Sequence, residues 1–100
     1  MMIRKSLEND VLTVFLSGRL DTSNSAEFDS AVRESVDSVN EVVLDMRGLE
    51  YTSSSGLRVI LALHKLMDGK GGKLVLRNVN SYIMEIFDVT GFSDILTIEK

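Results

Sequence analysis

The sequence predicts an α/β protein built on one mixed sheet, antiparallel at its start and parallel afterwards, with helices packed against it. Three observations support this fold class. A hairpin pattern comes first, two short apolar strands follow later, and stretches of helical periodicity separate the strands. The length of 100 residues suits one domain, and we expect it to span residues 1–100. Right-handed crossovers would bring the loops after the parallel strands to one edge, where ligands and partners usually bind.

The hairpin is predicted over residues 2–18. Apolar and polar side chains alternate over 2–8, as in a half-buried strand. Asn9 and Asp10 tolerate the positive φ of a two-residue turn, and residues 11–18 form the returning strand.

The first helix is predicted after a loop at residues 19–23. Asn24, with Glu27 three residues later, resembles a capping box. After this cap, apolar residues recur at helical spacing with polar residues between them. They are Phe28, Val32, Val36 and Val39.

The central part of the chain alternates strand and helix. Residues 41–45 are mostly apolar, as in a strand buried on both faces, and we interpret residues 46–52 as a loop. The second helix is predicted over 54–68, and the glycine cluster that begins at Gly69 ends it. Residues 73–77 form another short apolar strand.

The third helix has its own start and stop signals. Asn80 is the predicted cap and Gly91 the predicted stop. One stripe of this helix consists of Ile83, Ile86, Phe87 and Thr90. Residues 95–98 are either a final short strand or a frayed tail.

Composition excludes several classes of function. The chain has no cysteine and one histidine, His64, which excludes disulfides, thiolate zinc sites, cysteine nucleophiles and multi-histidine metal sites. With 11 basic and 15 acidic residues the net charge is −4, which argues against binding nucleic acid or an anionic membrane surface. No apolar run is long enough to span a bilayer and no signal-peptide core is present, so we expect a cytoplasmic protein.

No residue pattern predicts catalysis. The serines at 53–55 lack the glycine of a nucleophile elbow, since position 52 is Thr52. His64 lies about 15 Å along the helix from Ser54, too far for a general base. Asp45 has no second carboxylate spaced to pair with it. We therefore expect no enzyme, no catalytic residue, no cofactor and no metal.

The serines before the second helix are the most informative segment, and capping is their simplest interpretation. On a wheel of about 100° per residue with Leu57 at zero, an apolar arc runs from about 140° to 300°. This predicted core face consists of Val59, Ile60, Ala62, Leu63, Leu66 and Met67. Ser55, near 160°, points into it.

The opposite side of the wheel carries a predicted contact surface. Ser54 lies near 60°, in line with Leu57 and Leu61 at about 0° and 40°. An exposed serine flanked by two exposed leucines suggests a site for a partner. The alternative is that both leucines pack beneath a loop.

An exposed serine at a helix N-terminus has a physical consequence. A phosphate on it would face free backbone N–H groups and the positive end of the helix dipole, so the helix would tolerate phosphorylation. A partner resting on Leu57 and Leu61 would have to desolvate about two negative charges. Phosphorylation would then switch binding while leaving the domain folded.

Several segments together resemble the STAS domain family, most closely its stand-alone anti-sigma factor antagonists of the SpoIIAA type. Residues 14–21 end in the Gly-x-Leu-Asp pattern of the family's second strand. Residues 44–46 and 51–57 resemble its Leu-Asp-Leu and Asp-Ser-Ser-Gly-Leu signature, and Gly72 and Gly91 match later landmarks. The resemblance extends over most of the chain.

The resemblance implies a regulatory, non-enzymatic protein. In this family the serine after the signature aspartate is phosphorylated by an anti-sigma factor that is itself a GHKL-type serine kinase. The unphosphorylated antagonist binds that kinase and frees a sigma factor, and a metal-dependent PP2C-type phosphatase resets the cycle. By position the phosphoacceptor is Ser54, which the wheel also selects. The implied partner surface consists of Asp21, Ser54, Gly56, Leu57, Arg58 and Leu61.

The chain departs from the signature at Ser53, which stands where the family has aspartate, so a local negative charge is absent. Ser53 and Ser55 are rival phosphoacceptors. Arg58 stands where many members carry a small residue, and would alter the choice of partner. Asp21 matches a loop residue near the docking surface, and turn or cap chemistry explains it equally well.

Two other hypotheses stay open. A constitutive STAS adaptor, a subunit of a lipid-transport or signalling complex, would keep the fold without phosphorylation, and Ser53 favours it. An enzyme or small-ligand binder would use the loop edge of the sheet, for which the sequence offers no catalytic pair.

Overall fold

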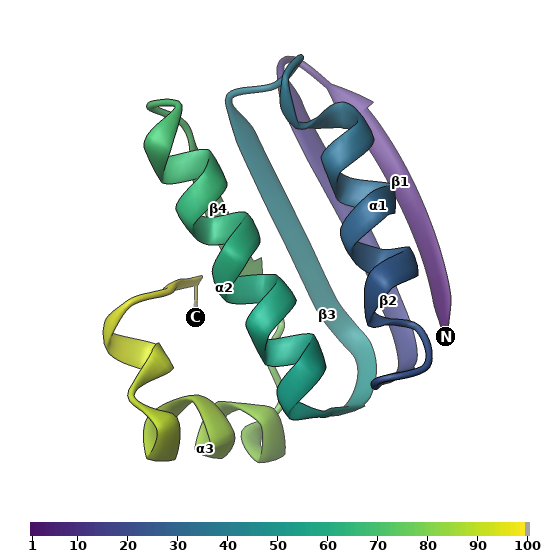
Figure 1. Ribbon diagram of the computed structural model, residues 1–100, viewed down its shortest axis with the longest axis vertical. Helices are drawn as coiled ribbons and strands as arrows, with labels where there is room; N and C mark the ends of the chain where they lie inside the picture. The colour runs from purple at the N-terminus through teal and green to yellow at the C-terminus, as the bar shows by residue number, and fades with distance from the viewer. Residues whose placement is uncertain (100) are drawn as a thin grey trace.

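The computed structural model describes residues 1–99. Its elements, in chain order, are β1 (Met2–Glu8), β2 (Val11–Leu20), α1 (Ser25–Val36), β3 (Glu41–Thr52), α2 (Ser54–Gly69), β4 (Lys73–Arg77), α3 (Ser81–Thr90), a 3-10 helix η1 (Phe92–Asp94) and β5 (Thr97–Glu99). Figure 1 shows their arrangement.

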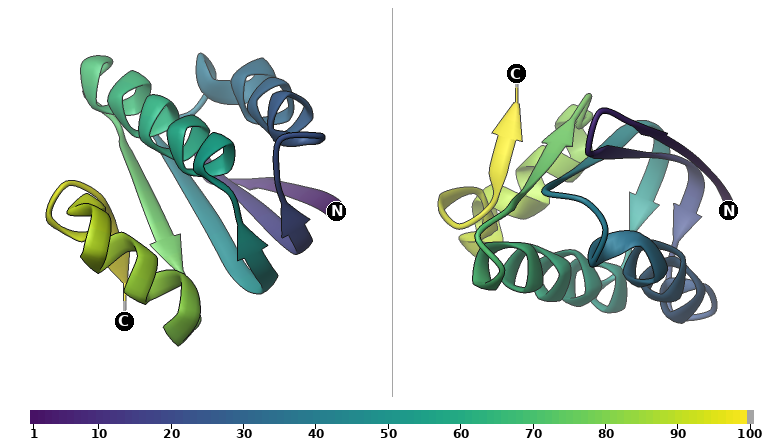
Figure 2. Two further views of the ribbon diagram at one scale, coloured as in Figure 1. Left: turned by 60° about the horizontal axis from the view of Figure 1, so that its bottom comes forward. Right: turned by 90° about the horizontal axis from the view of Figure 1, so that it is seen from above.

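The strands form one five-stranded sheet whose order in space, β1-β2-β3-β4-β5, is the order of the chain. β1 pairs antiparallel with β2, and each later strand pairs parallel with the one before it. α1 and α2 lie side by side on one face of the sheet, and α3 lies at the end where α2 begins (Figures 1 and 2). The predicted fold class is confirmed.

The core lies between the helices and the face of the sheet that they cover. Alternate residues of the strands point to this face, for example Leu12 and Val14 on β2 and Val42 and Leu44 on β3. Other fully buried side chains of the core are Phe28, Ile60, Leu63, Met67 and Phe87. Val43, between two core residues of β3, is buried but lies outside this cluster, so it belongs to the opposite face.

β3 is longer than predicted, because residues 46–52 continue the strand instead of forming a loop. Its pairing with β2 shifts register between Phe15 and Ser17 and again after Gly18. These irregularities explain the error, since a bulge breaks the alternation by which a strand is recognised in sequence. Met46, Leu49 and Thr52 are buried with exposed residues between them.

The predicted capping box of α1 is wrong. Asn24 precedes the helix but makes no side-chain cap. Its Oδ1 accepts from the Asp21 N–H at 2.9 Å and its Nδ2 donates to the Arg19 carbonyl at 2.8 Å, so the side chain closes the loop instead. The Asp21 carbonyl accepts from the N–H groups of Asn24 and Ser25. The helix also ends at Val36, so Val39 is buried in the core beyond it.

The other local predictions hold. Asn9 and Asp10 adopt positive φ values of 52° and 67° in the hairpin turn. Asn80 caps α3 by accepting from the Ile83 N–H at 2.8 Å, and Gly91 ends it at a φ of 82°. The tail contains a short strand, β5, after η1. Over residues 1–99, no helix is long and apolar enough to cross a membrane.

Candidate functional site

The serine segment lies where the β2–α1 loop meets the first turn of α2, at the carboxyl ends of β2 and β3 (Figure 1). Two contacts join the two segments. The Ser53 N–H donates to the Leu20 carbonyl at 2.9 Å, and the hydroxyls of Thr22 and Ser55 lie 3.2 Å apart. The loop that carries Asp21 therefore lies directly beside the serines, as the resemblance implied.

Ser53 is the cap of α2, as a serine at this position predicts. Its backbone is extended and its Oγ accepts from the Gly56 N–H at 3.4 Å. Ser54, the first residue of the helix, is exposed as expected. The amides of the first helical residues have no carbonyl partner within the helix. A group attached to the Ser54 hydroxyl would therefore lie beside free donors.

Gly56 holds the first turn of α2 tightly against the sheet. A Cβ at this position would lie 2.5 Å from the Thr52 Oγ1 and 2.7 Å from the Leu20 Cγ. Only glycine fits this contact without displacing its neighbours. Gly56 is buried, so it positions the serines instead of presenting a side chain.

The predicted exposure of Leu57 is wrong. Leu57 is 7% exposed and belongs to the core, whereas Leu66, assigned to the core face, is 37% exposed. Leu61 and Ser55 are half-buried. Apolar residues occupy most of the circumference of α2, so their pattern does not fix which arc faces the sheet. Packing turns the buried arc toward Leu57, about 80° from the predicted centre.

Asp21 organises the loop beside the serines. Its Oδ1 accepts from the Ser23 hydroxyl at 2.6 Å and from the Ser23 N–H at 3.0 Å. These hydrogen bonds favour the charged form and lower the pKa of the Asp21 carboxyl below its usual value, with a smaller contribution from the charge of Arg19. Asp21 thus has the turn chemistry that was one of its two interpretations.

A shallow groove between α1 and α2 begins at the serine segment, and no sequence pattern indicated it. It has a volume of about 340 Å³ and is lined by Ser25, Asp29, Arg33, Ser55, Arg58, Val59 and Ala62. Arg58 is exposed one turn after Ser54. Arg33 is held by an ion pair with Asp29 at 2.8 Å. The groove depends on α1 and α2 being neighbours, and a local sequence pattern does not show which helices pack together.

The remaining polar candidates lie elsewhere. His64 is ten residues along a continuous α2, about 15 Å from Ser54, which matches the sequence prediction. The Asp45 Oδ1 accepts from the Arg47 N–H at 3.0 Å and from the Asn78 Nδ2 at 3.1 Å, a structural role. Within residues 1–99, no three histidine, aspartate or glutamate side chains gather as metal ligands.

Comparison with known proteins identifies relatives of this chain. The model of the STAS domain family matches residues 3–100. The anti-sigma F factor antagonist of Paenibacillus polymyxa is 32% identical over 102 residues, covering 98% of this chain and 86% of the relative.

Two solved structures share the fold. An anti-sigma factor antagonist from Mycobacterium paratuberculosis superposes with a TM-score of 0.87 at 20% identity, covering 97% of this chain and 83% of the other. The Bacillus cell fate determinant SpoIIAA in its phosphorylated form gives a TM-score of 0.79 at 15% identity, covering 99% and 92%.

Proposed function

The chain belongs to the STAS domain family and to its anti-sigma factor antagonists, and from this premise we propose that it is a regulatory switch controlled by phosphorylation of Ser54. In its unphosphorylated form it binds an anti-sigma factor kinase of the GHKL type and so releases a sigma factor for transcription. A PP2C-type phosphatase restores the binding form. The protein acts as a single cytoplasmic domain and catalyses no reaction.

The observation that carries this proposal is the position of Ser54. It is the exposed serine at the start of α2, whereas Ser53 is occupied as the cap and Ser55 contacts Thr22. A kinase can therefore reach the Ser54 hydroxyl without opening the fold. Ser53 and Ser55 are the less accessible acceptors, since both are half-buried.

A phosphate on Ser54 would change binding more than folding. Nearby amides and the helix dipole favour the new charge, so α2 stays formed. A partner that covers Ser54 would have to remove water from about two negative charges. The surface that we assign to the partner consists of Asp21, Ser54, Arg58 and Leu61, with Gly56 and the buried Leu57 supporting it from below.

The test is to purify the tagged protein from its own cells under phosphatase inhibition, and to identify its partners and phosphosites by mass spectrometry. We expect phosphate on Ser54 and co-purification of a GHKL-type kinase. Ser54→Asp should reduce recovery of the kinase at least tenfold, and Ser54→Ala should retain it. Ser55→Ala, one residue away, is the matched control. Normal kinase binding by Ser54→Asp would contradict the proposal.

Ser53 supports a second candidate function, a constitutive adaptor that is not phosphorylated. Because Ser53 replaces the signature aspartate, the residue next to the phosphoacceptor carries no negative charge, although it still caps α2. In this case the same purification would recover a lipid-transport or signalling complex with no phosphate on the chain. Ser54→Ala would then leave both binding and biological output unchanged.

A further inference from the structure

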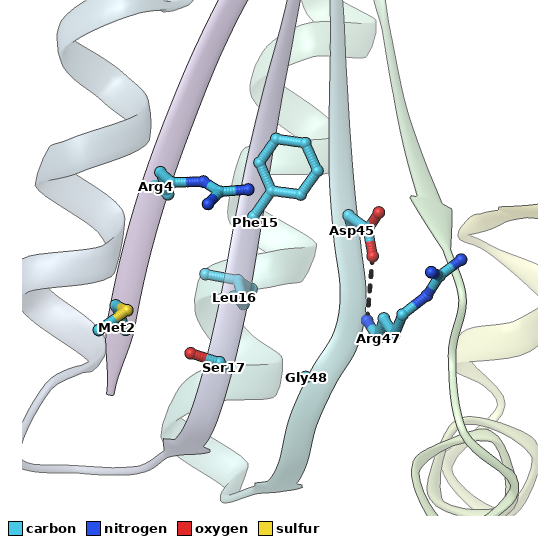
Figure 3. Close-up of a pocket in the computed structure, with 8 residues that line it drawn as sticks. All are labelled: Met2, Arg4, Phe15, Leu16, Ser17, Asp45, Arg47 and Gly48. Carbon is cyan, nitrogen blue, oxygen red and sulfur yellow. Dashed lines mark hydrogen bonds between the residues drawn. The ribbon is translucent and has the colours of Figure 1, made fainter.

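The face of the sheet opposite α1 and α2 contains a hollow. Figure 3 views this face, and within residues 1–99 no helix lies in front of β1, β2 and β3 there. The hollow has a volume of about 460 Å³. Its lining consists of Met2, Arg4, Phe15, Leu16, Ser17, Asp45, Arg47 and Gly48. This volume falls within the range of about 300–1,000 Å³ that is usual for small-molecule sites.

The bulge in β3 shapes the hollow. Phe15 pairs with Asp45, but Ser17 pairs with Gly48, so β3 has one extra residue over this stretch. Met46 in the core and Arg47 on the outer face still follow the alternation of β3, and the extra residue moves the next core position from Gly48 to Leu49. The Arg47 N–H is satisfied by Asp45. Bulges often redirect a side chain next to a functional site.

Charge in the hollow is positive. Arg4 and Arg47 are exposed, and within residues 1–99 neither guanidinium has an ion pair with a carboxylate. The other charged residue of the lining, Asp45, already accepts two hydrogen bonds. By contrast, Arg77 on β4 is paired with Glu99 at 2.9 Å. The hollow thus has a net charge of +1, with both of its cations free to bind an anion.

The walls of the hollow are partly apolar. The half-buried ring of Phe15 stands between Arg4 and Asp45 in Figure 3, and Met2 lies on the β1 side. The Arg4 guanidinium lies 5.0 Å from the centre of the Phe15 ring, a cation–π contact that holds its charge beside the ring. A flat apolar group can therefore pack beside Phe15 while its charge reaches an arginine.

We propose that this hollow is a binding site for a small aromatic anion, a flat ring that carries a carboxylate, sulfonate or phosphate group. The ring packs against Phe15 and Met2, and the anionic group binds the Arg4 guanidinium beside that ring. Arg47, on the far side of Asp45 in Figure 3, adds positive charge from a greater distance. The site lies on the face of the sheet away from the α1–α2 groove, so it goes beyond the proposed switch at Ser54. It needs neither phosphorylation nor a kinase.

Naphthalene-2-sulfonate is a suitable probe, titrated into the full chain and followed by ¹⁵N–¹H NMR. For a ligand of this size in an open site, we expect a Kd on the order of 1 mM. The amide signals of Phe15, Ser17, Asp45 and Arg47 should shift together and saturate. Shifts that do not saturate, or that centre on the exposed side chains of α3, would overturn the proposal.

Two substitutions test the charges. Arg4→Gln should weaken binding roughly 5-fold, because it removes a charge-assisted contact at an exposed site. Arg47→Gln should weaken it less, because the Arg47 charge acts from a greater distance and is screened by salt. Both residues are exposed, so the variants should fold, and their amide spectra will check this. Arg33→Gln, on α1 and outside the hollow, is the matched control and should leave the Kd unchanged. Unchanged binding by Arg4→Gln would contradict the assignment.

Two further ligands separate the parts of the proposal. 2-Naphthalenemethanol has the ring without the charge, and inorganic sulfate has the charge without the ring. We expect each to bind at least 5-fold more weakly than naphthalene-2-sulfonate. Equal binding by either compound would show that the hollow recognises only a ring or only an anion, and would overturn the proposal.

Discussion

The two ends of α2 are held in place by different kinds of contact. At its start, Gly56 leaves no room for a Cβ, Ser53 is bonded through both its N–H and its Oγ, and Ser55 contacts the neighbouring loop. At its end, a Cβ on Gly69 would meet nothing within 4 Å. The long side chain of Lys70 holds that end, through its Nζ at 2.6 Å from the carbonyls of Val36 and Val39.

This difference shows where the position of α2 is determined. The first turn is fixed by short contacts among backbone and small side chains, which leave little freedom. The last turn is held by a flexible exposed side chain, which tolerates change. The first turn of α2, which is fixed by tight contacts, is the one that presents Ser54. Tight packing and the proposed site therefore coincide.

Glycine substitutions should give the largest difference in stability between changes at the two ends of α2. Gly56→Ala should destabilise the protein by about 2–3 kcal/mol, because the added methyl group overlaps Thr52 and Leu20. Gly69→Ala, in the same helix, should stabilise it by up to about 1 kcal/mol through helix propensity. Urea unfolding of both variants measures the difference. Equal effects of the two substitutions on stability would contradict the idea that the start of α2 is packed more tightly than its end.

Replacing the cap should give the next largest effect. Ser53→Ala should cost about 1 kcal/mol, because the Gly56 N–H loses its acceptor. Ser53→Asp restores the family signature and should keep the cap while gaining about 0.3–1 kcal/mol from the helix dipole. Thermal unfolding at low and high salt distinguishes the two contributions, since salt screens only the charge. A Ser53→Asp variant as unstable as Ser53→Ala would refute this account of the cap.

At the opposite end, Lys70→Met should cost only about 0.5 kcal/mol. It removes two partly buried hydrogen bonds of an exposed residue, and water can take the place of the ammonium group at both carbonyls. The same urea series measures it, with Lys65→Met as an exposed control on α2. A loss larger than that of Ser53→Ala would mean that the end of α2 is fixed as firmly as its start.

The smallest effect concerns the pH dependence of the loop beside Ser54. The hydrogen bonds from Ser23 lower the pKa of Asp21 in the folded state. Stabilisation by this carboxylate is therefore complete above the unfolded pKa of about 3.9, and is lost as the pH falls through the lower, folded-state pKa. NMR titration of the carboxyl carbon should give a midpoint below the ordinary value. Ser23→Ala should raise that midpoint, and an unchanged value would exclude the hydroxyl as the cause.

Local signals predicted most of the fold correctly. The turn at Asn9 and Asp10, the caps at Ser53 and Asn80 and the stop at Gly91 depend on residues close in sequence. Asn24 is the exception. Its side chain had two sets of backbone partners within reach, and the loop closed by Arg19 and Asp21 competed successfully with the helix end.

Long-range packing explains the other errors. The burial of Leu57 follows from how α2 sits on the sheet, and the length of β3 follows from a bulged pairing with β2. For the site, helical periodicity selected Ser54 as the exposed serine, and the family resemblance suggested that Asp21 lies near it. The α1–α2 groove and the hollow around Phe15 had no sequence signal, because each is assembled from separate elements.

The order of the strands has a consequence for synthesis. Each strand of the sheet pairs with the strand made immediately before it, so no strand has to wait for a later one. Chains emerge N-terminus first at about 5–20 residues per second. Each new strand therefore meets a partner that has already emerged, and the sheet grows at a single edge while β1 remains the other. Assembly in chain order therefore limits incorrect strand pairing during translation.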